Sequence, residues 1–496
     1  MSVSIPSLST STNSSSAVDQ LVSLYIQSVS TPVYNLQSQQ SQVNSQISIL
    51  QKLKSSLSSL QTQASSLGQI GTLSPLAART VSSSNSTVVT ATATSSANIG
   101  THSLLVTQLA KNDTLVSSQL TQSGTDISTA TGAGTFTFSV TVNGTTTDVN
   151  VAVNSGDSNS TIMSNMATAV NSLGLGVTAS VVNDTSSTAR LVFQSKSSGS
   201  TNAISVADVT GTLAASVGWT SGVISGRTAS TSTGAGYVNS SASSLDANFT
   251  LDGVPIVRGS NSVSDVLTGV TLNLAAAQQP TDTPVTLNVA PDTSAIQSTV
   301  QAFISAYNSA INTLKSDTTD TTSTDSSGNV SVTRAPLAGN VAFMNLSLSM
   351  QEILMGQVSS AQSGNPNMLS QVGITLGSDG TLSISDQSKF TSAVTTNPSA
   401  FVDLFNSSSG VAVQMNSLMQ QYVQPGGTID QEVNGAQDQV TALSNQISSM
   451  QNNINIQADA VRKQYTAYES LLIQLNSTQS SLNNIWSGMA ASGMAV

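Results

Sequence analysis

A chain of 496 residues with 38% hydrophobic content is long enough for three or more domains with packed cores. Only 7% of its residues are charged and the net charge is -11, so no basic surface is expected for a nucleic acid. Cys is absent, which excludes disulfides, thiolate catalysis and Cys-based metal sites. No apolar run reaches the length of a membrane span and the start lacks a signal-peptide pattern, so we expect neither membrane insertion nor Sec export.

The N-terminal region begins with a Ser/Thr-rich stretch, residues 1–16, for which we expect disorder in the free chain. A shorter helix at 18–29 follows, and Pro32 separates it from a longer one. The longer helix is predicted by apolar residues repeating every seven positions, before Gly68 ends the pattern. This first seam consists of Leu36, Val43, Leu50, Leu57 and Ala64, accompanied by Ile47, Leu53, Leu60 and Leu67.

From Thr72 the pattern changes to alternating β-branched residues, which predicts strands. Asn143-Gly144 supplies the positive φ of a type I′ turn and joins the strands of a hairpin. A short amphipathic helix at 162–173 and two further strands complete a ββαββ module. The predicted strands are 88–94, 104–107, 135–142, 149–153, 177–182, 189–193, 249–251, 254–257, 270–274 and 285–289.

Helices return after residue 290. The apolar face of the first runs from Val300 to Leu314 at spacings of three and four. Others are expected at 340–355, 385–395 and 398–405, with a turn at Asp379-Gly380. The last helical stretch, 431–486, carries the second seam, again at seven-residue steps: Val433, Val440, Ile447, Ile454, Val461, Tyr468, Leu475 and Leu482.

The companions of the second seam change sides after Ile454. Upstream they stand three residues after each seam position, and downstream four, at Ala458, Tyr465 and Leu472. We therefore expect a change of packing near residue 455 and two sub-segments. The first seam is the expected partner upstream, whereas the downstream part needs another. An ordinary intramolecular bundle and additional contacts between chains both remain open.

These patterns predict an α+β multidomain fold in which a terminal coiled-coil stem with legs carries inserted β-rich domains. Residues 36–75 with 291–455 form the predicted stem, and 1–35 with 456–496 form flexible terminal legs. Residues 76–125 with 236–290 form one β-rich domain, and 126–235 the other, which holds the ββαββ module. Because no ionisable side chain follows Ser470 except the chain end, we expect 456–496 to order only on contact with a partner.

The residues that usually perform catalysis or bind metals do not form a convincing site. The single histidine, His102, is predicted to be a surface or packing residue, and neither a G-x-S-x-G nor a phosphate-binding loop is present. Asp317, Asp320 and Asp325 lack the ligand spacing of an EF-hand and predict a solvated loop. We expect no enzyme activity, metal or cofactor, and we read the Asn-x-Ser/Thr triplets as chance. Trp219 should be core, whereas Trp486 is either core or an interface anchor.

Several motifs, in order along the chain, resemble the flagellar filament-cap family, also called FliD or flagellar hook-associated protein 2. The ββαββ module is similar to one shared with flagellins. The start departs from the family, since only Val18-Asp19, Leu21-Val22 and Pro32 match its pattern there. The motifs that resemble the family are Val106-Thr107-Gln108-Leu109-Ala110-Lys111, Leu251-Asp252-Gly253-Val254, Gly269-Val270-Thr271-Leu272, Ala335-Pro336-Leu337-Ala338-Gly339-Asn340, Val372-Gly373-Ile374-Thr375-Leu376, Asp379-Gly380-Thr381-Leu382 and Gly426-Gly427-Thr428-Ile429-Asp430.

The resemblance implies a homo-oligomeric ring at the growing tip of the bacterial flagellum, outside the cell. Such a ring would help flagellin fold and polymerise and would prevent monomer leakage, with the terminal helices as legs on the filament end. It also implies export through the flagellar type III machinery with an export chaperone and without a cleaved signal peptide. Two alternatives stay open: an adhesin that binds host glycans or mucin through its β domains, and another hook-associated or filament subunit.

Overall fold

The computed structural model describes residues 14–491, which fall into two compact units. The terminal unit comprises Met1–Gly68, Val300–Phe390 and Asp403–Val496, and the central unit comprises Gln69–Thr299 with Thr391–Val402. Most of the stretch expected to be disordered, residues 1–13, lies outside the described part; Ser14 already begins a helix. Mixed helix and strand with a long C-terminal helix confirms the predicted fold class.

The helices outside the β regions follow the apolar patterns closely. Pro32 sits in the first turn of α2, where its missing N–H is tolerated, and Ser30 separates α2 from α1 as predicted. One helix, α11, was not predicted. The bounds are α1 Ser14–Val29, α2 Thr31–Leu67, α7 Thr293–Thr318, α8 Val341–Met355, α9 Gln387–Thr396, α10 Pro398–Asn406, α11 Val411–Val423 and α12 Thr428–Ala491.

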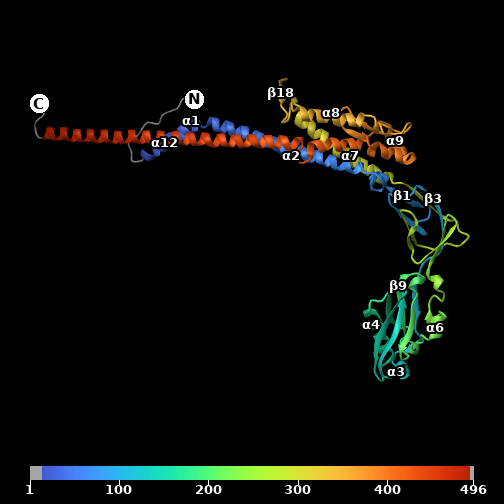
Figure 1. Ribbon diagram of the computed structural model, residues 1–496. Coiled ribbons are helices and arrows are strands. Elements are labelled where there is room, and N and C mark those ends of the chain that lie inside the picture. Colours follow the sequence, from blue (N-terminus) through green and yellow to red (C-terminus); the bar gives the residue numbers. More distant parts are fainter. Residues whose placement is uncertain (1–13, 492–496) are drawn as a thin grey trace. The chain divides into compact units, whose positions relative to one another are not determined.

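The last helix, α12, is continuous from Thr428 to Ala491, so the predicted division into two sub-segments is wrong for the backbone itself. Its sequence contains no proline, and its glycines, Gly435 and Gly488, do not interrupt it. Figure 1 shows α12 lying along α2 and α1 and then extending beyond the end of α1. The change of companion residues after Ile454 therefore does not come from a break in the helix, and the helices that pack against α12 explain it.

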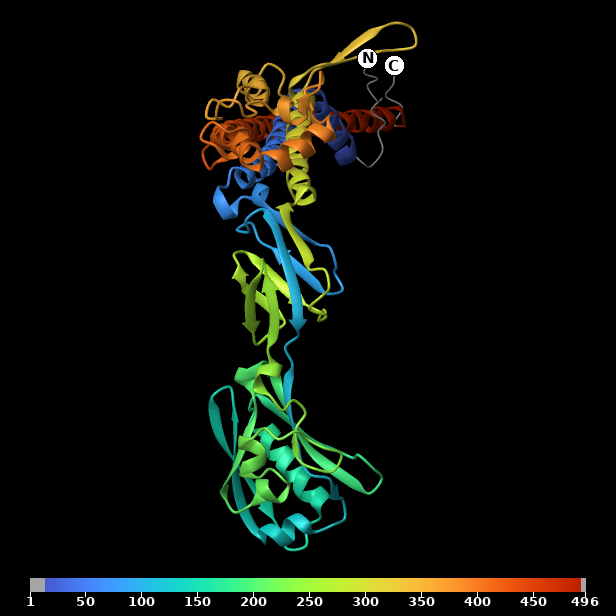
Figure 2. The ribbon, with the colours of Figure 1, turned by 90° about the vertical axis from the view of Figure 1, so that its right-hand side faces the viewer.

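The central unit is built from antiparallel strand pairs around two apolar cores (Figure 2). One core lies between the sheet β1-β16-β3-β12-β13 and the sheet β14-β15-β2. The strands are β1 Arg79–Ser83, β2 Val89–Ala93, β3 Gly100–Gln108, β12 Ala247–Leu251, β13 Val254–Arg258, β14 Ser262–Leu267, β15 Val270–Leu274 and β16 Val285–Pro291.

The other core includes the ββαββ module. The hairpin turn at Asn143 and Gly144 has φ of 51° and 70°, which confirms the type I′ prediction. Its core begins with Leu115, before the predicted domain start at residue 126, because β4 and β5 pair with β9. The elements are β4 Asn112–Val116, β5 Leu120–Thr121, α3 Asp126–Thr131, β6 Gly134–Val142, β7 Thr145–Val153, α4 Asn159–Ser172, β8 Val177–Val182, β9 Thr188–Ser198, β10 Ser205–Thr210, α5 Leu213–Ser216, α6 Ser221–Ser225 and β11 Gly236–Tyr237.

Two small hairpins belong to the terminal unit. The strands β19 Ile374–Leu376 and β20 Leu382–Ile384 are joined through the predicted turn at Gly380, which has φ of 74°. The strands β17 Thr321–Thr324 and β18 Val330–Thr333 pair only with each other. Part of the stretch expected to be a solvated loop is therefore a hairpin, because alternating Val330 and Val332 favour a strand.

Candidate functional site

The two predicted seams meet along the first part of α12. Lys54 contacts Asp430, while Val33 packs with Ile447 and Ile454, so α2 and α12 run antiparallel. On α2, Val43, Leu50 and Leu57 are buried and Leu36 is half-buried. On α12, Ile447 and Ile454 are buried, and Val433, Val440 and Val461 are half-buried. We call this covered part of α12, residues 433–461, the proximal seam.

The change of companion residues coincides with a change of partner helix. Around Ile447 and Ile454 the seam packs against the start of α2, at Val33 and Leu36, together with the end of α1, at Ile26 and Val29. Beyond Ile454, Ala458 packs between Val18 and Val22 of α1. Because α1 and α2 are separate helices, their apolar faces need not be in phase, and the four-residue step accommodates the new face.

Three polar contacts align the helices along the proximal seam. Lys54 of α2 donates a hydrogen bond to the carboxylate of Asp430 and lowers the pKa of that group. Further along, the Tyr25 hydroxyl donates to Gln457 Oε1 at 3.0 Å. Arg462 Nη1 lies 2.5 Å from Asp19 Oδ1. These pairs fix the antiparallel register rather than adding much stability, because they are partly exposed.

Beyond Arg462 the same apolar pattern continues, but its side chains are largely exposed. Tyr468, Leu475, Leu482 and Trp486 are between 52% and 69% exposed. Tyr465, Leu472 and Ile485 beside them are also exposed. We call this part of α12, residues 463–486, the distal seam. A helix with a long exposed apolar stripe is typical of a docking surface, since isolated water-exposed stripes of this length are unfavourable.

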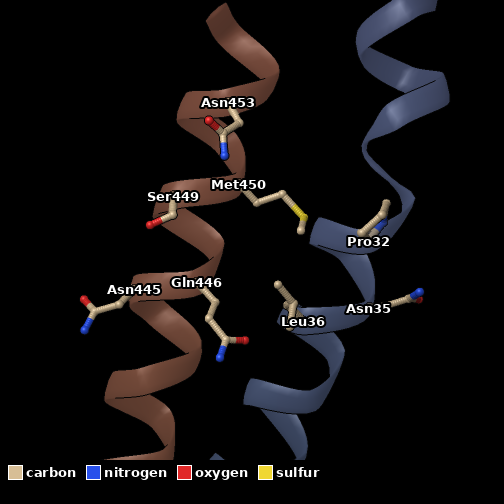
Figure 3. A pocket seen from close by; sticks show the side chains of 8 residues that line it. All are labelled: Pro32, Asn35, Leu36, Asn445, Gln446, Ser449, Met450 and Asn453. Carbon is tan, nitrogen blue, oxygen red and sulfur yellow. The ribbon is translucent and has the colours of Figure 1, made fainter. Parts of the chain in front are cut away.

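A shallow groove of about 610 Å³ lies where α1 gives way to α2 against α12. Figure 3 shows Leu36 and Met450 facing each other across it, with the amide of Gln446 beside them. Asn445 and Asn453 line it from α12, and no ionisable side chain contributes. Its chemistry suits packing and amide hydrogen bonds and offers no group for acid, base or metal work.

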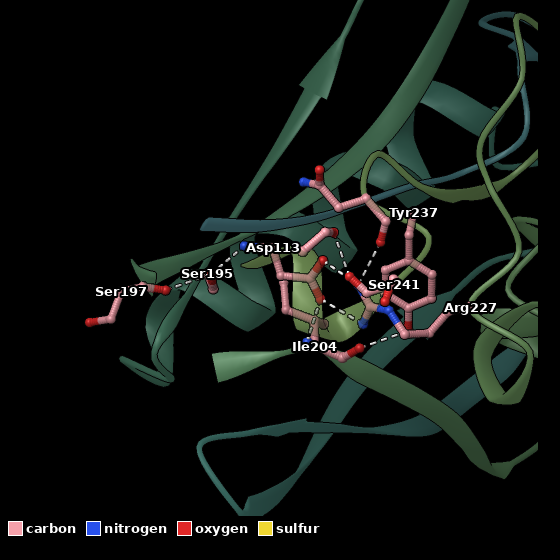
Figure 4. Close-up of polar contacts among 9 residues, drawn as sticks. Asp113, Ser195, Ser197, Ile204, Arg227, Tyr237 and Ser241 are labelled. Atoms are coloured by element: carbon pink, nitrogen blue, oxygen red, sulfur yellow. Dashed lines mark hydrogen bonds and ion pairs between the residues drawn. The ribbon is translucent and has the colours of Figure 1, made fainter. Parts of the chain in front are cut away.

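A buried ion pair stabilises the second core of the central unit (Figure 4). Asp113 is fully buried and accepts two hydrogen bonds from Arg227, at 2.8 and 3.1 Å, and a third from Ile204 N at 2.8 Å. The Arg227 guanidinium stacks 3.9 Å from the ring centroid of Tyr237. Burial raises the pKa of Tyr237 to about 12, and its hydroxyl donates to Ile204 O. Because its charge is paired, Asp113 fastens the 227–237 segment to the sheet, and its carboxylate is not available for catalysis.

The remaining candidates also have structural roles. His102 Nδ1 lies 2.7 Å from Asp252 Oδ2, and the hydrogen bonds from His102 and from Ser103 N lower the pKa of Asp252. His102 of β3, predicted to be a surface or packing residue, is thus paired with Asp252 in the turn between β12 and β13. Among the described residues, no group of three or more His, Cys, Asp or Glu is placed to hold a metal ion. Trp219 is core, with its ring tilted against that of Phe193 at a centroid distance of 4.6 Å, whereas Trp486 is exposed.

Sequence reasoning missed two features of the terminal unit. Helix α11 buries Val411, Met415 and Met419 at four-residue spacing, a pattern that could have been recognised. The outer face of α8 repeats the same kind of stripe as the seams and went unnoticed. The Asp113–Arg227 pair joins residues 114 positions apart, and no local pattern could have revealed it.

Two family models match this sequence. The model of the flagellar hook-associated protein 2 N-terminus matches residues 13–113, and that of the C-terminus matches residues 244–477. Together they cover more than half of the chain. The chain belongs to the flagellar hook-associated protein 2 family. Most of the residues of the second core, 114–243, lie between the two matched regions.

Individual members of the hook-associated protein 2 family align over most of their length. The A-type protein of Pseudomonas aeruginosa is 28% identical over 414 residues, 81% of each chain. The Escherichia coli K12 protein is 27% identical over 456 residues, 91% of each. The crystal structure of the D1-D2-D3 domains of the flagellar cap protein FliD from Escherichia coli matches with a TM-score of 0.56 at 24% identity. That match covers 78% of this chain and 99% of that one, and it shows a shared fold.

This family is one of structural flagellar proteins and not an enzyme class. The resemblance drawn from the motifs is thereby confirmed. None of the helices within residues 14–491 combines the length and apolarity needed to cross a membrane.

Proposed function

We propose that this protein is the cap of the bacterial flagellar filament. Copies form a ring at the growing tip, outside the cell, which promotes flagellin folding and polymerisation and prevents monomer leakage. Support comes from the relatives, which are named flagellar hook-associated protein 2 and, among solved structures, flagellar cap protein FliD. The ring, the flagellin contact and the place at the tip are parts of the proposal.

The observation that carries the proposal is the distal seam. It presents a regular apolar stripe with no ionisable side chain after Glu469, so it binds by packing and not by charge. The filament end would offer the matching apolar surface, which the distal seam does not meet among the described residues. In this proposal the distal seam is the leg that rests on the filament end and orders fully only there.

Export through the flagellar type III channel with a chaperone, and without a cleaved signal peptide, belongs to the same proposal. A chain without Cys has no disulfides to break, and with only 7% charged residues it has few ion pairs to break, before it is threaded unfolded. The adhesin and filament-subunit alternatives gain no specific observation from the described residues, so we retain the cap.

A deletion strain tests the proposal. Cells without the gene should release flagellin monomer into the medium and lack full filaments, and the intact gene should restore them. Complementation with the triple variant Leu475→Ser, Leu482→Ser and Trp486→Ser should fail, because these exposed residues form the contact. The matched control changes neighbouring polar residues, Gln474→Ala and Asn483→Ala, and should restore filaments. Normal filaments in the deletion strain would contradict the cap.

A further inference from the structure

The terminal unit holds two further exposed surfaces with apolar side chains, apart from the distal seam. They are the hairpin formed by β17 and β18, which we call the arm, and the outer stripe of α8. In the arm, all eight strand residues are exposed. A two-stranded hairpin without a core is marginal in water, so an ordered one needs a further contact.

The arm has two chemically different faces. Pairing places Val330 opposite Thr324 and Val332 opposite Thr322, so these four side chains share one face. The other face carries Ser323 and Ser331, whose hydroxyls are 2.6 Å apart. Such alternation is typical of a sheet with one face on a core and the other in solvent. Yet both valines are about two-thirds exposed, 66% and 63%.

Both ends of the arm are fixed by hydrogen bonds. At its tip, Asp325 Oδ1 accepts from Ser327 N and Asn329 N, at 2.8 and 2.9 Å. At its base, Ala335 N donates to Asp320 Oδ1 at 2.8 Å and Leu337 N donates to Asp317 O at 2.7 Å. The arm is thus preformed, which lowers the entropic cost of docking its apolar face.

Helix α8 offers a complementary surface. Its inner face buries Phe343, Leu346, Met350 and Leu354. On the opposite side, residues at alternating spacings of three and four form the outer stripe: Val341, Met344, Leu348, Gln351 and Met355. The four apolar members are 50% to 66% exposed. A helix that is apolar on both sides is normally covered on both sides.

We infer that the arm of one copy docks its valine face on the outer α8 stripe of a second copy. Each chain carries one arm and one stripe. The residues named for the two faces are uncharged, although exposed Glu352 lies beside the stripe, so a head-to-tail contact satisfies both. The arm cannot easily serve its own chain, since its base is fixed through buried Ala335 and Leu337, and Figures 1 and 2 show it standing clear of the helices. Repetition of such a contact closes a ring when the rotation allows it.

This inference rests on the proposed ring and assigns it an interface. The absence of native Cys makes cross-linking decisive. V332C and L348C proteins are purified separately, mixed, and treated with a short bismaleimide. We expect covalent dimers in the mixture, few in either variant alone, and a ladder in the V332C/L348C double variant. The control S323C, on the polar face of the same arm, should give at least tenfold less dimer with L348C.

Three results would overturn the inference. The first is no excess of dimer over the S323C control. The second is a double variant that links only within its own chain, which would mean that the arm covers its own α8. The third is flagellin, and not a second copy, captured by a photoreactive maleimide attached at position 348 of the L348C variant.

A second measurement separates this interface from the ring itself. In sedimentation velocity, V330S/V332S should weaken self-association at least tenfold, whereas S323A/S331A should not change it. Because these residues are exposed, neither variant should alter the circular dichroism spectrum. Unchanged oligomers in V330S/V332S would overturn the proposed arm contact but not the proposed ring. A wild-type protein that stays monomeric would overturn both proposals.

Discussion

The proximal and distal seams of α12 share one helix and one apolar repeat, but only the proximal one is covered. Ile447 and Ile454 are buried against α2 and α1, whereas Leu475 and Leu482, seven-residue steps further on, are exposed. Among the described residues, the polar contacts of α1 with α12 reach Arg462, and the apolar residues further along α12 are exposed. A heptad repeat therefore predicts that a helix packs against a partner, but it does not identify that partner.

The largest expected effect is on stability, and it should distinguish buried from exposed apolar residues. Leu57→Ala removes a side chain that is fully buried in α2 and should destabilise the helical unit by about 2–5 kcal/mol, through lost burial and a residual cavity. The matched exposed variant, Leu475→Ala, should change stability by less than about 0.5 kcal/mol. Thermal unfolding followed by circular dichroism at 222 nm measures both. Equal effects would mean that the distal seam is covered in the free protein.

A smaller, local effect should follow when α1 is detached from α12. Val18→Ser with Val22→Ser removes the apolar contact to Ala458 and should make residues 454–462 resemble the distal seam. Amide hydrogen exchange there should accelerate on the order of tenfold, because local opening becomes easier. Exchange in residues 433–447, which pack on α2, provides the internal control and should stay unchanged.

The smallest effect concerns the Lys54–Asp430 contact. The lowered folded pKa of Asp430 means that its contribution is complete above the ordinary aspartate pKa of about 3.9 and is lost as pH falls through the lower folded value. Lys54→Met should therefore lower the unfolding midpoint slightly at pH 6, and the difference from wild type should shrink below about pH 4. Unfolding midpoints across this pH range measure it. A difference that grows on acidification would contradict the assigned pairing.

Much of the fold could be predicted because the deciding signals are local. Asn143-Gly144 determines its turn through positive φ, Pro32 and Gly68 delimit α2, and alternating β-branched residues define most strands. The failures have equally physical reasons. The hairpin of β17 and β18 was hidden by its polar Thr and Ser content, and α11 by its short length between loops. The start of the second core was missed because β4 pairs with β9, about 80 residues away in sequence.

The sequence by itself determined that both ends of this chain are helical, that their apolar seams require partners, and that the region between them is β-rich. Periodicity and turn chemistry act over a few residues, so they are readable without a fold. Only the tertiary structure decided that α12 packs on α1 beyond Ile454 and that Asp113 forms an ion pair with Arg227. It also decided that, among the described residues, the distal seam and the outer α8 stripe are exposed. Those outcomes depend on which distant surfaces meet, and no local pattern encodes that choice.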